Sequence, residues 1–278
     1  MWNGLDINKC PSCGVLFVVN APSQEELVRL YGDHDLVEDC PDPNLDAERW
    51  LPPWKMAEHA HLLDLLAKGG AGDGTLLDVG CFSGMFLRNA KLRGYEVTGV
   101  EPNKDAVSSI RNFYKFEIVH GHLHSGGFSS GRFSVVSFLD VIEHLRDPIG
   151  DLKESFRVLR PGGLLLLTTP NVKALLQQAV RTKRWFARQA WCPIDDVPWH
   201  LWGFAPDTLS VCAEKAGFAV KKIVWLDPSP LSTNLGAGAT SAKKKALRAV
   251  SRVSKWIGQS DRFALIAQKP ADRNGARA

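Results

Sequence analysis

The sequence predicts an α/β protein built on an open, mostly parallel sheet with helices on both faces. Three observations indicate this class. Short apolar runs typical of buried strands alternate with segments of helical periodicity between residues 54 and 169. A turn from Gly80 to Gly84 joins the first of these runs to a helix. Glu101 ends the next run, at the sheet edge where ligands of such folds bind.

The expected elements follow one another along the chain. A helix over 54–68 carries apolar residues at Met56, Ala60, Leu63 and Leu66, which lie on one helical face. After it we expect strands at 75–80, 96–100, 117–120, 134–139 and 163–169, separated by helices at 84–93, 104–114 and 149–160. This alternation predicts a parallel sheet with right-handed crossovers.

Other segments interrupt or precede this pattern. We expect residues 1–53 to form an N-terminal knuckle and linker, and 54–278 to form the main domain. Within it, 171–206 is dense in tryptophan and arginine and is expected to be a helical lid over a substrate pocket. A second insertion, 228–258, begins as a Gly, Ser and Pro loop and continues as a basic helix over 242–257.

Composition indicates an ordinary soluble protein. Of the 278 residues, 45% are hydrophobic and 23% are charged. The net charge of +4 is too small to predict nucleic-acid binding by itself. We expect no signal peptide and no membrane-spanning segment. The six cysteines show no disulfide framework, which is typical of a reducing cytoplasm, so we expect a cytoplasmic protein.

The glycine turn separates two families that bind nucleotide-like cofactors. Phe82 and Met85 stand where a Gly-x-Gly-x-x-Gly dinucleotide loop needs its second and third glycines, so that motif is excluded. The stretch instead resembles the loop of class I methyltransferases that use S-adenosylmethionine, which reads apolar strand, Asp, x, Gly, Cys, two variable residues and Gly. Phe82 departs from this pattern, because a glycine is common there.

Later motifs resemble the same family in the same order. Residues 140–148 read acid, two apolar residues, Glu-His, apolar, x, Asp-Pro, and resemble the subgroup that includes ubiquinone-biosynthesis O-methyltransferases. Residues 159–163 and 168–171 resemble the turn into the family's fifth strand and its exit. Ser134 and His122 depart from the pattern at positions where acids are common.

The resemblance implies a Rossmann-like sheet of seven strands. Its last two strands, expected at 218–226 and 262–268, would form an antiparallel edge hairpin. It also implies S-adenosylmethionine as cofactor. The expected cofactor-binding residues are Asp78, Gly80, Cys81, Ser83, Gly84, Glu101, Asp140 and Val141. Among these, Glu101 would accept hydrogen bonds from both ribose hydroxyls.

The resemblance also suggests catalytic residues. His144 and His200 are the candidate general bases, since an imidazole accepts protons near neutral pH. Asp140, Glu143, His144 and His200 together resemble the divalent-metal set of small-RNA 2′-O-methyltransferases. Two alternatives stay open: deprotonation by a histidine without metal, and a purely structural role for Glu143 and His144.

A structural zinc ion is not expected at the N-terminal knuckle. Methyltransferases of this type often carry a zinc ribbon before a Pro-Ser-x-Glu-Glu-Leu segment, which stands here at 22–27. This chain has only Cys10 and Cys13 where a ribbon needs four ligands. Cys40 is a third candidate, and the alternative is a pair of free thiols.

The expected function is methyl transfer from S-adenosylmethionine to a hydroxyl oxygen of a small molecule. One alternative is a non-catalytic cofactor-binding or regulatory protein on the same fold, which Phe82 and His122 motivate. Another is an RNA 2′-O-methyltransferase, although nucleic acid is not an expected partner. The basic helix at 242–257 is either a peripheral contact with an anionic membrane or a solvated face. The sequence predicts neither the acceptor nor the oligomeric state.

Overall fold

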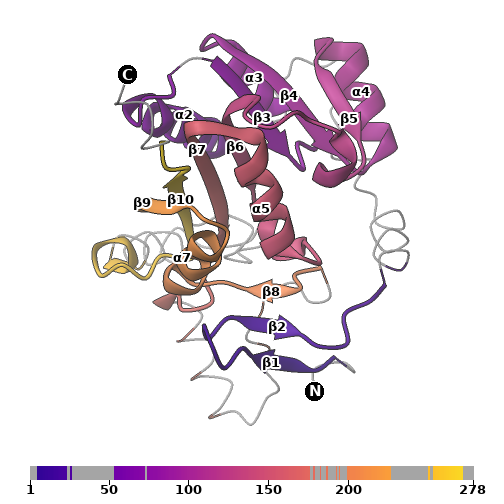
Figure 1. The fold of residues 1–278 in the computed structure, drawn as a ribbon. Helices are drawn as coiled ribbons and strands as arrows, with labels where there is room; N and C mark the ends of the chain where they lie inside the picture. Colours follow the sequence, from indigo (N-terminus) through magenta and orange to yellow (C-terminus); the bar gives the residue numbers. More distant parts are fainter. Residues whose placement is uncertain are drawn as a thin grey trace, which may run out of the picture.

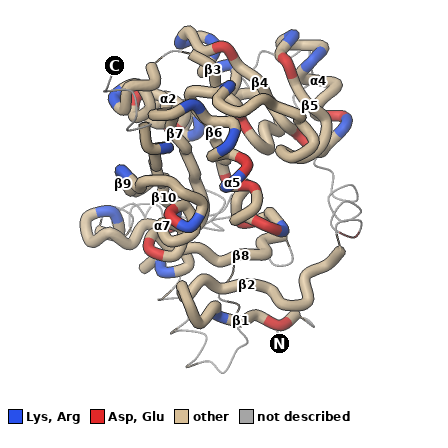
Figure 2. Tube along the Cα trace, viewed as in Figure 1, with Lys and Arg blue, Asp and Glu red and all other residues tan. Residues whose placement is uncertain are grey.

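The computed structural model describes residues 5–23, 53–72, 74–175, 199–226 and 253–271, and the single positions 26, 178, 182, 186, 192, 194 and 250. Strands and helices are packed into one layered unit, with a smaller sheet at the N-terminal end (Figure 1). Lysine, arginine, aspartate and glutamate are interspersed along the traced chain in this view (Figure 2). None of the described helices is both long enough and apolar enough to cross a membrane.

The larger sheet has the seven strands that the sequence predicts, six of them at about the expected positions. They are β3 (Gly74–Val79), β4 (Tyr95–Glu101), β5 (Glu117–His120), β6 (Phe133–Leu139), β7 (Leu159–Pro170), β9 (Ala219–Leu226) and β10 (Arg262–Gln268). Their spatial order is β5-β4-β3-β6-β7-β10-β9. The first five are parallel, and β10 is antiparallel to both β7 and β9, which confirms the edge hairpin. The strand order reverses between β3 and β6, where open α/β sheets form their ligand crevice.

Helices cover both faces of this sheet. They are α2 (Pro53–Lys68), α3 (Met85–Lys91), α4 (Lys104–Tyr114), α5 (Pro148–Val158) and α7 (Pro206–Lys215). Successive strand residues point to opposite faces. Leu77 and Val136 therefore pack in one core with α5 and α7, while Leu76 and Val135 pack in the other with α2, α3 and α4. All four strand side chains are fully buried.

The fifth parallel strand begins earlier than predicted. The helix expected to reach residue 160 ends at Val158, and β7 starts at Leu159. The turn residues Gly162 and Gly163 fall inside the strand, because both exchange backbone hydrogen bonds with Lys269 beyond the end of β10. Pairing of Leu159 with Phe133 of β6 and of the two glycines with Lys269, which local sequence does not report, thus extends β7.

A second sheet joins the N-terminal segment to a later part of the chain. It contains β1 (Ile7–Lys9), β2 (Leu16–Val18) and β8 (Trp202–Gly203), in the order β1-β2-β8. The predicted knuckle is the turn between β1 and β2, closed by a hydrogen bond from the Gly14 amide to the Cys10 carbonyl oxygen. Strand β8, which the sequence analysis did not predict, adds to β2. By this pairing, β8 places the residues that precede it in the sequence beside the larger sheet.

Several predicted segments lie largely outside the described residues. These are the linker after residue 23 with Cys40 and the insertion at 228–258, while half of the expected lid at 171–206 lies outside them. In the basic segment, the described positions 250 and 253–256 are helical.

Candidate active site

The glycine turn connects β3 to α3 and contacts the loop after β6. Gly80 and Gly84 have φ angles of 69° and 72°, in the left-handed region that side chains disfavour. A Cβ atom on Gly80 would lie 2.6 Å from the Cγ2 atom of Val141. Phe82 also has a positive φ, 43°, so its backbone adopts a conformation usual for glycine although its side chain is large. The predicted cofactor residues Gly80 and Val141 are therefore brought into contact.

Glu101 lies at the end of β4, where the sequence predicts it. Its side chain is buried, and its two carboxylate oxygens accept hydrogen bonds from the backbone amides of Phe82 (2.8 Å) and Asn103 (2.8 Å). Each oxygen has a second lone pair for another donor. Burial raises the pKa of Glu101 above its ordinary value, and the two amide donors oppose that shift. The carboxylate thus fixes the glycine turn and keeps acceptor capacity for a ligand.

Asp78 and Cys81 are buried within the turn, whereas Ser83 is partly exposed. The Ser137 hydroxyl donates to Asp78 Oδ1 at 2.6 Å. Burial, with a smaller contribution from the Glu101 charge, raises the pKa of Asp78 to about 7. Burial also raises the pKa of the Cys81 thiol well above its ordinary value, so this cysteine is a packing residue and not a reactive thiolate.

Asp140 follows β6 and takes part in an ion-pair network that the sequence analysis missed. It pairs with Arg262 and, at 3.2 Å, with Lys55, while Arg262 also pairs with Glu58 at 2.6 Å. The Thr168 hydroxyl donates to the other Asp140 oxygen. Burial alone would raise the pKa of Asp140, but the Arg262 and Lys55 cations outweigh it and hold that pKa well below its usual range.

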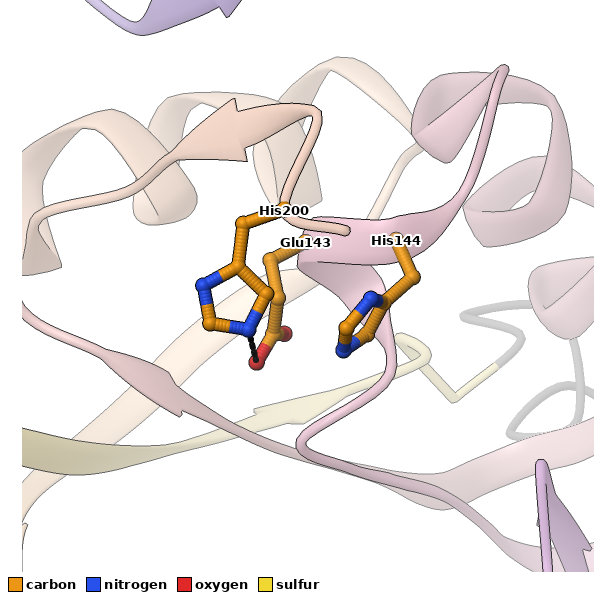
Figure 3. A group of neighbouring side chains, drawn as sticks. All are labelled: Glu143, His144 and His200. Atoms are coloured by element: carbon orange, nitrogen blue, oxygen red, sulfur yellow. Dashed lines mark ion pairs between the residues drawn. The ribbon is translucent and has the colours of Figure 1, made fainter. Parts of the chain in front are cut away.

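Glu143, His144 and His200 converge in the loop after β6 (Figure 3). Glu143 and His144 belong to a single 3-10 turn, Ile142–His144, and His200 approaches from the segment before β8. The Leu201 amide donates to the Glu143 carbonyl oxygen at 2.8 Å, which holds the two segments together. One ligand atom of each side chain lies within 4.8 Å of the others.

The carboxyl group of Glu143 is buried and is hydrogen-bonded at one oxygen. Thr169 donates to its Oε2 atom at 2.9 Å, and His200 Nε2 lies 4.0 Å from its Oε1 atom. Within the described part of the chain, no hydrogen bond reaches Oε1. Burial and the Asp140 charge raise the pKa of Glu143 to about 8. A buried carboxyl oxygen that faces two imidazoles has the position of a proton carrier or of a metal ligand.

The histidines have distinct environments. His144 Nδ1 is 2.8 Å from the Trp199 carbonyl oxygen, which only accepts, so this nitrogen carries the proton and Nε2 carries the lone pair. Burial, with a contribution from His200, lowers the pKa of His144 to about 4. The two rings meet edge to face with centroids 4.7 Å apart. His144 is therefore neutral at physiological pH.

The donor set fits a divalent transition metal in part. Two imidazole nitrogens and one carboxylate oxygen are the ligands of catalytic zinc sites, and Glu143 Oε1 is directed toward His200. The structure does not bring Asp140 into this group, because Arg262, Lys55 and Thr168 hold both of its carboxylate oxygens. Of the four residues predicted as ligands, three come together.

Cys10 and Cys13 lie apart from this site, in the turn between β1 and β2. Both thiols are partly buried and pack against the core that contains Cys212 of α7. The Cys10 thiol is 3.2 Å from the Ser12 hydroxyl, and hydrogen bonds from Ser12 and Cys13 lower its pKa to about 6.

Comparison with known proteins agrees with this geometry. A family model described as a methyltransferase domain matches residues 49–223. The chain is 29% identical over 138 residues to the ubiquinone biosynthesis O-methyltransferase of Alkalilimnicola ehrlichii, covering 45% of this chain and 56% of that protein. It is 25% identical over 187 residues to the Pseudomonas paraeruginosa enzyme of that name, covering 59% and 73%. The alignments thus span roughly half to three quarters of these curated relatives.

Solved structures show the same fold. A putative methyltransferase from Bacillus halodurans has a TM-score of 0.55 at 20% identity, over 77% of this chain and 100% of that one. The cyclase SpnF has a TM-score of 0.57 at 19% identity, over 90% and 98%. Because this fold also serves a cyclase, the reaction has to be argued from the site.

Proposed function

We propose that this chain, which belongs to the methyltransferase domain family, transfers a methyl group from S-adenosylmethionine to a hydroxyl oxygen of a small molecule. The observation that carries the proposal is the convergence of two groups at one sheet edge. The glycine turn with Glu101 lies against Val141, and the Glu143, His144 and His200 cluster begins two residues later. The proposed cofactor site and the proposed proton-accepting site are therefore adjacent.

The cofactor site is assigned to the turn and its supports. Glu101 would accept the ribose hydroxyls with the lone pairs that the Phe82 and Asn103 amides leave available. Asp78, Gly80, Cys81, Ser83 and Gly84 would shape the methionine side, and Asp140 and Val141 the side toward the acceptor. When bound, S-adenosylmethionine supplies a methyl group already activated by its sulfonium sulfur. The chain then contributes mainly by positioning the acceptor oxygen in line with the bond between the methyl carbon and the sulfonium sulfur.

A hydroxyl acceptor also has to lose its proton. We assign this step to His200, with His144 as the alternative base. A proton taken by His200 would produce an imidazolium 4.0 Å from Glu143 Oε1. Glu143 stabilises that cation where it is ionised, which its raised pKa of about 8 favours only at mildly alkaline pH.

A divalent metal is the second version of the same proposal. Glu143, His144 and His200 would hold it, and it would lower the pKa of an acceptor hydroxyl. In that version the histidines act as ligands and not as bases. The two versions predict different responses to chelation.

Titration calorimetry with S-adenosylhomocysteine tests the proposal, with and without chelator. Binding in both conditions supports the cofactor site. Methyl transfer to phenolic and alcoholic acceptors is then measured with tritiated cofactor for the wild type, His200→Ala and His144→Ala. If chelation abolishes activity and added metal restores it, the metal version is supported. If activity resists the chelator but is lost in His200→Ala, the version with a histidine base is supported. If the wild type does not bind S-adenosylhomocysteine, both the base version and the metal version of the proposal are contradicted.

A further inference from the structure

Four large hydrophobic side chains are exposed along one short segment before β10. Val250, Val253, Trp256 and Ile257 are 37%, 50%, 89% and 43% exposed. They are half of the eight large hydrophobic residues that the described part of the chain exposes. Single exposed hydrophobic residues are ordinary, but a cluster marks a contact surface. We call these four residues the apolar ridge.

The ridge occupies one face of a helical turn. At about 100° per residue, positions 250, 253, 256 and 257 fall within an arc of about 120°. Ser254 lies beside this arc, about 40° from Val250, is only 3% exposed, and donates from its hydroxyl to the Val250 carbonyl oxygen at 2.8 Å. The Ile257 amide donates to the Val253 carbonyl oxygen, which continues the helix. The helix is thus packed at Ser254 and presents apolar groups to solvent over the adjoining arc.

The ridge is anchored to the sheet edge that carries the candidate active site. The Leu175 amide donates to the Gln259 carbonyl oxygen, and the Asn171 side-chain amide donates to the Ser260 carbonyl oxygen at 2.9 Å. Arg262 then pairs with Asp140 at the end of β6. In Figure 1 the segment, gold in colour, projects at the periphery of the molecule beyond β9 and β10.

The sequence around the ridge is strongly basic. Residues 242–257 hold six lysines and arginines and no aspartate or glutamate: Lys243, Lys244, Lys245, Arg248, Arg252 and Lys255. The whole chain carries a net charge of only +4, so positive charge is concentrated in this segment. Aliphatic residues and tryptophan combined with a cluster of cations are typical of helices that lie in the interface of anionic membranes.

We propose that the apolar ridge docks this protein onto the surface of an anionic lipid bilayer. Trp256 and the β-branched residues would enter the boundary between headgroups and acyl chains, and the positive charge of the surrounding sequence would be attracted to the lipid phosphates. Single-stranded RNA fits less well, because three of the four ridge residues are aliphatic and offer no stacking platform. A second copy of the chain also fits less well, since it would place two segments of like charge together.

Vesicle co-sedimentation of the full chain tests this proposal independently of methyl transfer. The wild type is expected to bind phosphatidylcholine vesicles that contain phosphatidylglycerol, to bind pure phosphatidylcholine much more weakly, and to be released by salt. The double variant Val253→Ser, Trp256→Ser should lower the partition coefficient about tenfold or more, because two apolar side chains no longer enter the membrane. Leu92→Ser, at an apolar residue that is 72% exposed on α3's C-terminal side, is the matched control and should bind as the wild type does.

Fluorescence locates the contact. Trp256 is one of nine tryptophans, so part of the emission should be quenched by brominated lipids in the wild type. Trp256→Phe should keep most of the binding but lose much of that quenching. The proposal is overturned if the wild type does not bind anionic vesicles, or if the double variant binds as tightly as Leu92→Ser. Binding of RNA without binding of vesicles, or a dimer that the double variant dissociates, would also overturn it. Circular dichroism and melting curves confirm that each variant is folded.

Discussion

At the scale of single residues, Glu101 combines a structural and a binding role. Its carboxylate holds the Phe82 amide of the glycine turn and the Asn103 amide that precedes α4. The same oxygens are the proposed acceptors for the ribose. A buried acceptor that is already held by two backbone donors is preorganised, because no rotamer has to be selected when the ligand arrives.

Substituting Glu101 by alanine should therefore weaken binding of S-adenosylhomocysteine by roughly 1.5–3 kcal/mol, the scale of hydrogen bonds to a charged group. Titration calorimetry measures this directly. Glu101→Gln, which keeps one acceptor oxygen, should fall between the alanine variant and the wild type. Glu117→Ala, at a partly exposed acid on β5, serves as the control. Wild-type affinity in Glu101→Ala would contradict the assignment.

His59 is a second informative residue, because its protonation is coupled to folding. Asn89 Nδ2 lies 3.1 Å from its Nδ1 atom, so that nitrogen accepts and the ring is neutral. Burial, and secondarily the Lys55 charge, lowers its pKa from about 6.5 to about 3. Between these values the unfolded chain binds more protons than the folded protein, so stability decreases as the pH falls.

We expect the free energy of unfolding to decrease below pH 6.5, by up to about 1.4 kcal/mol per pH unit from this residue alone. His59→Asn offers an acceptor oxygen near the Nδ1 position and does not titrate. Its stability, measured by urea denaturation from pH 7 to pH 4.5, should decrease less steeply than that of the wild type. Parallel pH profiles for the two proteins would contradict the prediction.

At the scale of elements, the small sheet positions one side of the candidate site. Strand β8 pairs with β2 from the N-terminal segment, and the Trp202 indole donates to the Leu145 carbonyl oxygen at 2.6 Å. Leu145 directly follows His144, and His200 lies two residues before Trp202. The sequence predicts both histidines but not this element, because a two-residue strand has no periodicity and depends on a partner far away in the chain.

Trp202→Ala should therefore impair methyl transfer more than cofactor binding. Loss of the indole removes its hydrogen bond and its ring contact with Phe17, 5.8 Å between centroids, so His200 is held less firmly. We expect kcat to fall about tenfold to a hundredfold, since small displacements of a catalytic group have effects of this size. Affinity for S-adenosylhomocysteine should stay within about threefold, because the glycine turn is not contacted. An unchanged kcat would show that β8 does not position the base.

The seven-stranded sheet is the part that sequence predicts well. Its strands are local apolar runs bounded by glycine, and their order follows from alternation with helices and from the motifs at residues 78–84 and 140–148. The limits of β7 are predicted less well, because its first residue pairs with Phe133 of β6 and its glycines pair with the distant Lys269. Local patterns thus predict which elements form, whereas tertiary pairing decides where they begin.

At the scale of the whole molecule, a buried ion-pair network joins three distant parts of the chain. Glu58 of α2, Asp140 after β6 and Arg262 of β10 are 82 and 122 positions apart in sequence, and Arg262 is only 5% exposed. Each residue alone resembles an ordinary charged residue, so no motif predicts the network. It holds Asp140 away from the histidine cluster and ties α2 and the edge strand to the centre of the sheet.

Replacing Arg262 by methionine should destabilise the protein by about 3–5 kcal/mol at neutral pH, because buried Glu58 and partly buried Asp140 would then have only Lys55 to compensate them. Arg93→Met, which removes an exposed pair with Asp64 of α2, should change stability by at most about 1 kcal/mol and is the matched control. Urea denaturation measures both changes.

The pH dependence distinguishes this mechanism from a simple loss of packing. In the wild type the pKa of Asp140 is lower in the folded protein than in the unfolded chain. The ion pair therefore contributes its full stabilisation above the unfolded pKa. That stabilisation is lost as the pH falls from the unfolded pKa toward the folded pKa. In Arg262→Met, Asp140 loses its guanidinium partner, and its pKa rises. Protonation then relieves the partial burial of this less compensated charge, so the stability deficit of the variant should shrink as the pH is lowered from 7 toward about 4.5. A deficit that stays constant over this range would mean that Arg262 acts through the packing of its side chain and not through its charge.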